Sequence, residues 1–309
     1  MNNSSSSSSL LIVGSLGFDT IETPFGKGEN LIGGSGTYCS LAAGFFTSAK
    51  LVAVAGEDFL EAKKIFDEKN IDTAGVSIVP GKTLRWGAKY NFDLNNRQTL
   101  FTELNVLADF EPSLPKSYQN SDYIFLSSVP PAQHLQLVSQ LHKPKFIGLD
   151  TISFFIEKDL ADLKKILEKV DLFVINDTEA RELSGEHNLI KAAKKIFGMM
   201  KPNTYLIIKR GEYGLLMFDQ NKMFHLPGYP LEDVVDPTGA GDAFAGGLMG
   251  YLSKTRDTSW ENLKRACVAG SVMASFCVEK LGTEHLVEIS EADINQRFTD
   301  FQHLTHFET

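Results

Sequence analysis

The sequence predicts a three-layer α/β protein, in which helices cover both faces of a mostly parallel β-sheet, with a small β-strand lid beside it. Short apolar runs typical of strands buried on both faces recur along the chain, and segments with helical periodicity lie between them. This alternation builds βαβ units and therefore a parallel sheet. The length of 309 residues, with 43% hydrophobic and 22% charged residues, suits one large domain over residues 10–309.

The strands of the main sheet are predicted from continuous apolar runs. A strand covered on both faces needs apolar side chains at nearly every position. The runs are residues 10–13, closed by Gly14, and then LVAVAG from Leu51, YIFLSS from Tyr123, KFIGLD from Lys145, LFVIN from Leu172 and YLIIK from Tyr205.

The helices are predicted where apolar residues recur every three or four positions. Such segments are EDFLEAKKIFDEKN at 57–70, AQHLQLVSQLH at 132–142, LADLKKILEKV at 160–170 and LIKAAKKIFGMM at 189–200. A longer helix is predicted from Trp260 to about Glu279. Its small residues, as in ACVAGSVMASFCV, would let a neighbouring helix or a flat ligand approach closely.

One stretch, residues 83–106, breaks the alternation of strands and helices. It is rich in β-branched and aromatic residues, has the turn LNNR in its middle and shows no helical period. It therefore predicts a hairpin that stands apart from the main sheet, as a lid or a dimer surface. A lid commonly serves to exclude water from a reacting centre.

The segment GVSIVPGKT at residues 75–83 is similar to a phosphate-binding P-loop but fails its spacing. Five residues, instead of four, separate its two glycines, and it leads into a predicted strand rather than a helix. We therefore predict a turn before the hairpin at this place.

Composition excludes several classes of partner and site. A net charge of −9 argues against nucleic acid, and no apolar run approaches the ~20 residues that span a bilayer. Cys39, Cys267 and Cys277 are too few and too scattered for a disulfide framework or a zinc site. The Ser-rich residues 1–9 predict a flexible tail without the features of a signal peptide, so we expect a cytoplasmic protein.

The stretch DPTGAGD at residues 236–242 predicts an anion-binding loop, because a helix is predicted directly after it. Free N–H groups at Gly239, Ala240 and Gly241 would point outward at the positive end of the helix dipole. Asp242, in the first turn, either stabilises that dipole or acts as a general base. The residues alone leave both roles open.

The same stretch resembles the C-terminal signature of the ribokinase-like (PfkB) carbohydrate kinase family, D-x-T-G-A-G-D followed by a helix. Residues 236–242 match every specified position of that pattern. Other segments are similar to the family along nearly the whole chain from Leu10. They are GSLGFD at 14–19, the di-glycine segment GGSGTYCSLAAGFF at 33–46, NDTEAREL at 176–183 and KRGEYG at 209–214.

The resemblance implies an ATP-dependent kinase, in which a hydroxymethyl group of a small carbohydrate-type acceptor attacks the γ-phosphate. Asp242 would take the proton from the acceptor hydroxyl. The amides of Gly239, Ala240 and Gly241 would form the anion hole that stabilises the transferring phosphoryl group. The residues 18–31 and 83–106 would form the family's β lid.

The resemblance also implies the metals. Mg²⁺ would bridge the phosphates and be steadied, through water, by Asn176 and Glu179. Family members often bind K⁺ through the first aspartate of the signature, here Asp236, and through carbonyl oxygens nearby. Whether this chain binds K⁺ stays open.

The acceptor and the nucleotide are assigned to residues in the same way. Asp19 would accept hydrogen bonds from acceptor hydroxyls, and Gly33 and Gly34 would let the acceptor lie against the backbone. Tyr38 stands where many members have asparagine, so it could offer a ring to the acceptor. The nucleotide-binding positions that the resemblance implies are Asn176, Lys209, Gly211, Gly214 and Thr238.

The acceptor class is not fixed by these residues. A sugar phosphate needs basic residues, for which the lid offers Arg85, Lys89 and Arg97; a free sugar needs groups such as Asp19. A nucleoside needs an aromatic platform. The candidates for it are Tyr38, Trp86, Tyr90 and Phe92. We favour a neutral sugar or a nucleoside over a sugar phosphate.

Two other classes of protein are weighed against a kinase. One is a catalytically silent sugar- or nucleotide-binding protein on the same fold, which the intact anion loop disfavours. The other is an unrelated α/β hydrolase or oxidoreductase, which lacks both a G-x-S-x-G elbow and a nicotinamide fingerprint here. The predicted partners are therefore ATP and a small acceptor, with a homodimer through the lid left open.

Overall fold

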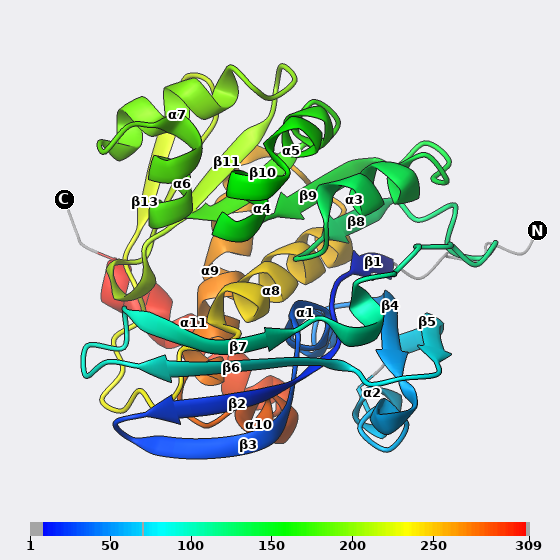
Figure 1. Ribbon diagram of the computed structural model, residues 1–309. Coiled ribbons are helices and arrows are strands. Elements are labelled where there is room, and N and C mark those ends of the chain that lie inside the picture. The colour runs from blue at the N-terminus through cyan, green and yellow to red at the C-terminus, as the bar shows by residue number, and fades with distance from the viewer. Residues whose placement is uncertain (1–8, 70, 307–309) are drawn as a thin grey trace, which may run out of the picture.

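The computed structural model describes residues 9–69 and 71–306 and confirms the predicted three-layer α/β fold (Figure 1). The main sheet has the strand order β13-β12-β11-β10-β9-β8-β1-β4-β5, parallel except at β11–β12 and β12–β13. Its strands are β1 (Ser9–Val13), β4 (Ser48–Gly56), β5 (Ile71–Val79), β8 (Tyr123–Leu126), β9 (Phe146–Asp150), β10 (Leu172–Asn176), β11 (Tyr205–Lys209), β12 (Leu215–Phe218) and β13 (Met223–Leu226). The predicted tail at residues 1–9 lies outside the described residues apart from Ser9, the first residue of β1.

The sequence analysis does not predict β5, β12 or β13. Strands β5 and β13 form the two edges of the sheet, where exposed or half-exposed residues interrupt the buried ones, so a search for continuous apolar runs misses them. The P-loop exclusion is confirmed, because residues 75–79 belong to β5 and the chain then enters a strand at Leu84.

Helices cover both faces of the main sheet. One face carries α1 (Ser35–Gly44), α8 (Ala240–Thr255), α9 (Trp260–Cys277), α10 (Glu284–Glu288) and α11 (Glu291–Thr305). The other carries α3 (Pro131–Val138), α4 (Ser153–Lys158), α5 (Leu160–Leu167), α6 (Asp177–Ser184) and α7 (Leu189–Phe197). In β1, Leu10 and Ile12 enter the first core and Leu11 and Val13 the second, as expected for a strand buried on both faces.

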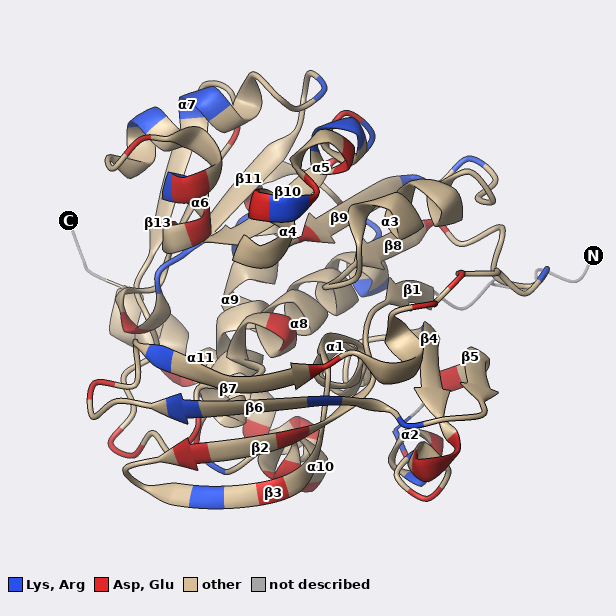
Figure 2. Cartoon of the chain, viewed as in Figure 1, with Lys and Arg blue, Asp and Glu red and all other residues tan. Residues whose placement is uncertain are grey.

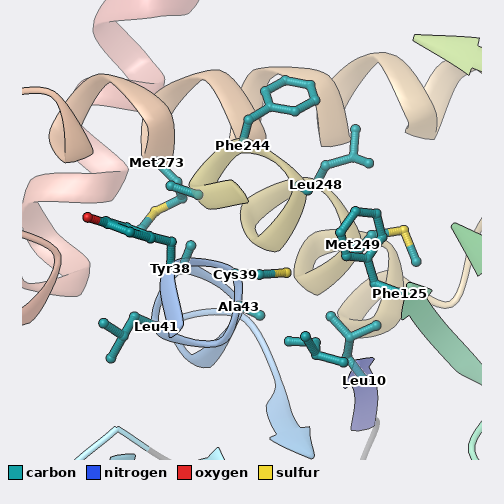
Figure 3. Close-up of a cluster of buried hydrophobic side chains, with 14 of the residues drawn as sticks. Leu10, Tyr38, Cys39, Leu41, Ala43, Phe125, Phe244, Leu248, Met249 and Met273 are labelled. Atoms are coloured by element: carbon teal, nitrogen blue, oxygen red, sulfur yellow. The ribbon is translucent and has the colours of Figure 1, made fainter. Parts of the chain in front are cut away.

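The first core brings α1 and α8 unusually close together. Figure 3 shows α1, which carries Tyr38 and Cys39, lying beside α8, which carries Phe244 and Met249. A Cβ on Gly246 would collide with the backbone of α1, so this glycine permits the contact. The α1–α8 contact matters for function because α8 begins at the predicted anion loop.

The predicted helix at 57–70 is wrong. The structure has a 3₁₀ turn at Glu57–Phe59 and a single turn of α-helix, α2, at Lys64–Asp67. Among residues 57–69, which the structure describes, only Phe59 and Phe66 are fully buried, so the segment lacks the continuous apolar stripe that would hold one long helix against the sheet.

A second, four-stranded sheet forms the lid and confirms the predicted hairpin. Its order is β3-β2-β6-β7, with β2 (Gly17–Thr23), β3 (Gly26–Gly33), β6 (Leu84–Tyr90) and β7 (Arg97–Glu103). Strand β2 continues from the carboxyl end of β1, so the lid stands at the carboxyl edge of the main sheet. Ligands of open α/β sheets bind at that edge.

Hydrogen bonds join the lid to the loops of the main domain around residues 235–238 and 212. The Thr23 hydroxyl donates to the Val235 carbonyl at 2.8 Å, and the Tyr90 hydroxyl lies 3.0 Å from the Thr238 hydroxyl. At the tip of the β6–β7 hairpin, the Asn95 amide donates to Glu212 at 3.3 Å. The lid therefore closes over the 236–242 loop in this structure. Within the part of the chain that the structure describes, no helix has both the length and the apolarity to cross a membrane.

Candidate active site

The loop at residues 236–239 is shaped by a buried carboxylate. One oxygen of Asp236 accepts the Thr238 amide at 2.9 Å, and the other accepts the Gly282 amide at 3.0 Å. Burial raises the pKa of Asp236, and these hydrogen bonds offset part of that rise. The carboxylate thus fixes the turn just before α8 and ties it to the segment after α9.

Gly239 caps α8 in a left-handed conformation, with φ of 76°. A side chain there would also collide with the ring of Tyr38, which lies under the loop. The described residues supply no hydrogen-bond acceptor for the amides of Gly239 and Gly241, while the Ala240 amide contacts the Pro237 carbonyl at 3.3 Å. Two of the three amides are therefore left without a protein partner in the described structure, and the third makes a long turn contact.

Asp242 lies in the first turn of α8, half-buried, beside Ser127 at the end of β8. The Ser127 hydroxyl donates to its carboxylate at 3.3 Å. Burial, and next the negative charge of Asp150, raise the pKa of Asp242 to about 6, against the opposing effects of Lys209 and Ser127. Such a carboxylate is ionised at neutral pH and is more basic than an exposed one, as a general base needs to be.

Lys209, the last residue of β11, lies beside the same loop. Its ammonium group donates to Asp150, the last residue of β9, at 2.7 Å, and lies 2.9 Å from where a Cβ on Gly241 would stand. Burial lowers the pKa of Lys209, but the negative charges of Asp150, Glu179 and Asp242 outweigh burial, so the pKa lies above its ordinary value. The site therefore holds a charged lysine within reach of an anion on the loop.

Asn176 and Glu179 form the capping box that begins α6. The Asn176 side chain accepts the Glu179 amide at 2.8 Å, and Glu179 accepts the Asn176 amide at 3.0 Å. Burial, with Asp150 as the next cause, raises the pKa of Glu179 to about 7. Across residues 9–69 and 71–306, no group of three or more His, Cys, Asp or Glu is placed to hold a metal directly. One oxygen of Glu179 has no protein donor in the described structure, which fits a metal held through water.

Asp19 lies on the inner face of the lid, 4% exposed. Its carboxylate lies against Gly33, where any Cβ would collide with it, and the nearby Gly34 amide favours its ionised form. Burial, and next the charges of Asp236 and Asp242, raise its pKa to about 7. In the β2–β6 register Asp19 is paired with Trp86, so the carboxylate and the indole share one face of the lid.

The four predicted aromatic residues lie in different environments. Tyr38 is 1% exposed and its hydroxyl finds no hydrogen-bond partner among the described residues; it forms the floor of the loop. Tyr90 is bonded to Thr238, and Phe92 is 80% exposed at the hairpin tip against Phe25. Only Trp86 combines partial exposure with a place beside Asp19.

The predicted nucleotide-side turn at residues 209–214 joins β11 to β12. Gly211 begins a 3₁₀ turn at Gly211–Tyr213, and the Arg210 amide closes it on the Gly214 carbonyl at 2.7 Å. The lid tip touches this turn through Asn95, so the turn, the 236–242 loop and the lid enclose one site. Lys209, Gly211, Gly214, Thr238 and Asn176 all lie at the carboxyl ends of neighbouring strands or in the loops that follow them.

Sequence reasoning missed two neighbours of this site. Ser127 holds Asp242, and Asp150 pairs with Lys209. Both stand at or just after the carboxyl end of a predicted strand, YIFLSS and KFIGLD. That position is a signal that could have found them, because the carboxyl ends of parallel strands share one edge.

Comparison with known proteins places the fold and the loop in one family. The model described as pfkB family carbohydrate kinase matches residues 14–289. A cytidine kinase of Thermococcus kodakarensis is 30% identical over 262 residues, which cover 80% of this chain and 89% of that protein.

Solved structures share the fold at low identity. A nucleoside kinase of Burkholderia thailandensis in complex with inosine matches with a TM-score of 0.75 and 20% identity, covering 94% of this chain and 98% of that one. An E. coli ribokinase II candidate in complex with ATP and Mg²⁺ matches with a TM-score of 0.75 and 16% identity, covering 95% and 99%. These structures show the architecture that the two chains share with this one.

The buried carboxylate of Asp19 should cost stability. Its pKa in the folded chain, about 7, lies above the ordinary value of 3.8, so folding favours the protonated form and stability falls as pH rises from 4 to 7. We expect Asp19→Asn to raise the melting temperature by several degrees at pH 8 and to leave it unchanged near pH 4. Thermal unfolding at both pH values measures this. Asp109→Asn, at an exposed carboxylate, serves as control; a lower melting temperature for Asp19→Asn at pH 8 would contradict the account.

Proposed function

The chain belongs to the pfkB family of carbohydrate kinases, and from that premise we propose that it is a nucleoside kinase, which transfers the γ-phosphate of ATP to the hydroxymethyl group of a nucleoside. The family makes it a phosphotransferase with an alcohol as acceptor. The observation that carries the nucleoside proposal is the pairing of Asp19 with Trp86 on the inner face of the lid.

The acceptor end combines a hydroxyl-binding group with a flat surface. Asp19 would accept hydrogen bonds from two ribose hydroxyls, while Gly33 and Gly34 leave the backbone open to the sugar. Trp86 is partly exposed on the same face of the lid and would offer its ring to the base. A free sugar would use Asp19 but leave Trp86 without a role. Tyr38 would contribute from beneath, by supporting Gly239 rather than by stacking on the ligand.

The transfer step would be carried by the 236–242 loop. Asp242 would take the proton of the attacking hydroxyl, as its raised pKa favours. The amides of Gly239 and Gly241, with that of Ala240 after a small shift, would hold the oxygens of the transferring group. Ser127 keeps the Asp242 carboxylate turned toward this position.

The nucleotide would lie on the side of β10 and β11. Lys209 would leave Asp150 for an ATP phosphate oxygen, the 211–214 turn would line the nucleotide, and Thr238 would shape the loop beside its terminal phosphate. Mg²⁺, when bound with ATP, neutralises phosphate charge. Asn176 and Glu179 would hold its water ligands.

A phosphorylated acceptor is disfavoured by the ion pairs of the lid. Arg85 lies 3.5 Å from Asp58, and Lys89 is paired with Glu22. Figure 2 shows the basic residues of β6 running beside the acidic residues of β2. Of the predicted basic candidates, only Arg97 has no carboxylate within ion-pair distance in the described structure. The lid therefore offers a phosphorylated acceptor a single unpaired cation among these three candidates.

Potassium dependence, a lid-mediated homodimer and a cytoplasmic location remain predictions. Asp236 is buried and has no cationic partner in the described part of the chain, so K⁺ beside it would offset an uncompensated charge.

Strand β7 is exposed along its length at the edge of the lid, which suits pairing with a second copy. Light scattering on the purified chain tests the dimer. We expect a molar mass twice that of one chain, and the mass of a monomer would contradict the homodimer.

The function is tested by ADP release from Mg·ATP with cytidine, inosine, ribose, fructose and a sugar phosphate, each with and without K⁺. We expect turnover with nucleosides, stimulated by K⁺. We expect Asp242→Asn to keep Mg·ATP affinity and to lose about 10²-fold or more in kcat. Turnover with a sugar alone would reassign the acceptor. Silence with every acceptor, despite ATP binding, would indicate a binding protein that has lost its chemistry.

The pH profile tests the role of Asp242 and Ser127 together. We expect kcat/KM to fall as pH drops below about 6, because protonated Asp242 accepts no proton. Removing a hydrogen bond from a carboxylate raises its pKa, so Ser127→Ala should move this limb to higher pH. Ser128→Ala, at a neighbour whose hydroxyl makes no hydrogen bond to the described residues, is the matched control. A limb that stays in place in Ser127→Ala would remove Ser127 from this role.

A further inference from the structure

Arg97 differs from the other basic residues of the lid. Arg85 and Lys89 each face a carboxylate, whereas Arg97 pairs with none in the described part of the chain. Its guanidinium lies over the ring of Trp86, 5.3 Å from the centroid, and its charge opposes the rise that burial causes in the pKa of the Tyr90 hydroxyl. An exposed cation on the inner face of a lid is available to a ligand.

The register and the lid contacts place Arg97 between the two halves of the site. Arg97 begins β7 and is paired with Tyr90 of β6. Tyr90 touches Thr238 of the anion loop, while Asn95, at the hairpin tip, touches the turn at Glu212. Arg97 therefore lies between two residues that contact the site: its strand partner Tyr90, which contacts the anion loop, and Asn95, two positions earlier, which contacts the nucleotide-side turn.

The charge of the site calls for a cation at this position. Three carboxylates, those of Asp150, Glu179 and Asp242, gather around one lysine, Lys209, which is already engaged by Asp150. Burial raises the pKa of Asp242 and Glu179 most, followed by Asp150, and Arg97 is among the groups that lower both. Bound ATP adds further negative charge, and in the transition state that charge spreads over the three equatorial oxygens of the phosphoryl group.

We propose that Arg97 is a catalytic residue: its guanidinium leaves the face of Trp86 and donates to an equatorial oxygen of the transferring phosphoryl group. This inference rests on the proposed nucleoside kinase activity. In the step, the bond from the acceptor oxygen to the γ-phosphorus forms and the bond from that phosphorus to the β,γ-bridging oxygen breaks. The hydroxyl proton goes to Asp242, ADP leaves, and Arg97 stays protonated throughout.

The position of the guanidinium in this structure couples the two substrates. It covers the face of Trp86 on which a base would stack, so a nucleoside that occupies that face displaces Arg97 toward the phosphates. The acceptor thereby helps to assemble the site that phosphorylates it. Water alone would not displace Arg97, which reduces wasteful hydrolysis of ATP.

The test compares Arg97→Met, Arg97→Lys and, as the matched control on the outer face of the lid, Lys89→Met. We expect Arg97→Met to lower kcat by about 10²–10³-fold, with KM values for ATP and nucleoside changed far less. Arg97→Lys should recover part of the loss, and Lys89→Met should keep wild-type kcat. Unchanged Mg·ADP affinity in all three variants shows that they are folded.

The outcomes separate this inference from the proposed function. If the wild type turns over and the kcat of Arg97→Met stays within threefold of the wild-type value, or only its KM changes, the catalytic role of Arg97 is overturned and the proposed function stands. Absence of turnover by the wild type with every acceptor overturns the proposed function, and this inference with it.

A second measurement follows the displacement without turnover. The chain has two tryptophans, so Trp260→Phe leaves Trp86 as the sole tryptophan, whose emission is excited selectively above the absorption of tyrosine. We expect cytidine to change its emission in that background, and we expect Arg97→Met to alter the emission of the ligand-free form. Emission that is the same with and without Arg97 would show that the guanidinium does not cover the ring in solution.

Discussion

The site depends on one buried carboxylate that has no cationic partner among the described residues. Both oxygens of Asp236 accept backbone amides, from Thr238 and Gly282, and this fixes the turn that starts α8. Because the turn is held from inside, the amides of Gly239 and Gly241 are left to face outward. Tyr38 supports the loop from below and the lid closes on it from above. A loop without this anchor would turn its amides toward its own carbonyls.

The same site concentrates negative charge where burial penalises it. Asp19 and Glu179 have pKa values raised to about 7, and Asp242 to about 6, with burial as the main cause in each. A chain selected only for stability would not keep these groups together. Their proximity makes sense if substrates with hydroxyl groups, magnesium and the two nearby cations complete the site. The cations then take opposite sides: Lys209 comes from the main sheet and Arg97 from the lid.

The sequence predicted those parts of the structure that local pattern encodes. Continuous apolar runs predict the central strands, and DPTGAGD predicts the turn and the helix that follows. Contacts between distant segments were beyond such reasoning. Asp19 and Trp86 become neighbours only through the β2–β6 register, and Arg97 reaches the site only because the hairpin folds back over the loop. Tyr38 was expected to face the acceptor, yet its helix turns it under Gly239. The edge strands, half covered, lacked the uniform apolar run.

The central claim is that the 236–242 loop directs the γ-phosphate onto the hydroxymethyl group of a nucleoside. The most direct measurement is the ³¹P NMR spectrum of the product formed from cytidine and Mg·ATP. The account predicts a phosphomonoester signal split into a triplet by the two protons of the 5′-methylene group, together with ADP. A doublet from coupling to a single ring proton, or inorganic phosphate without a nucleotide product, would contradict it.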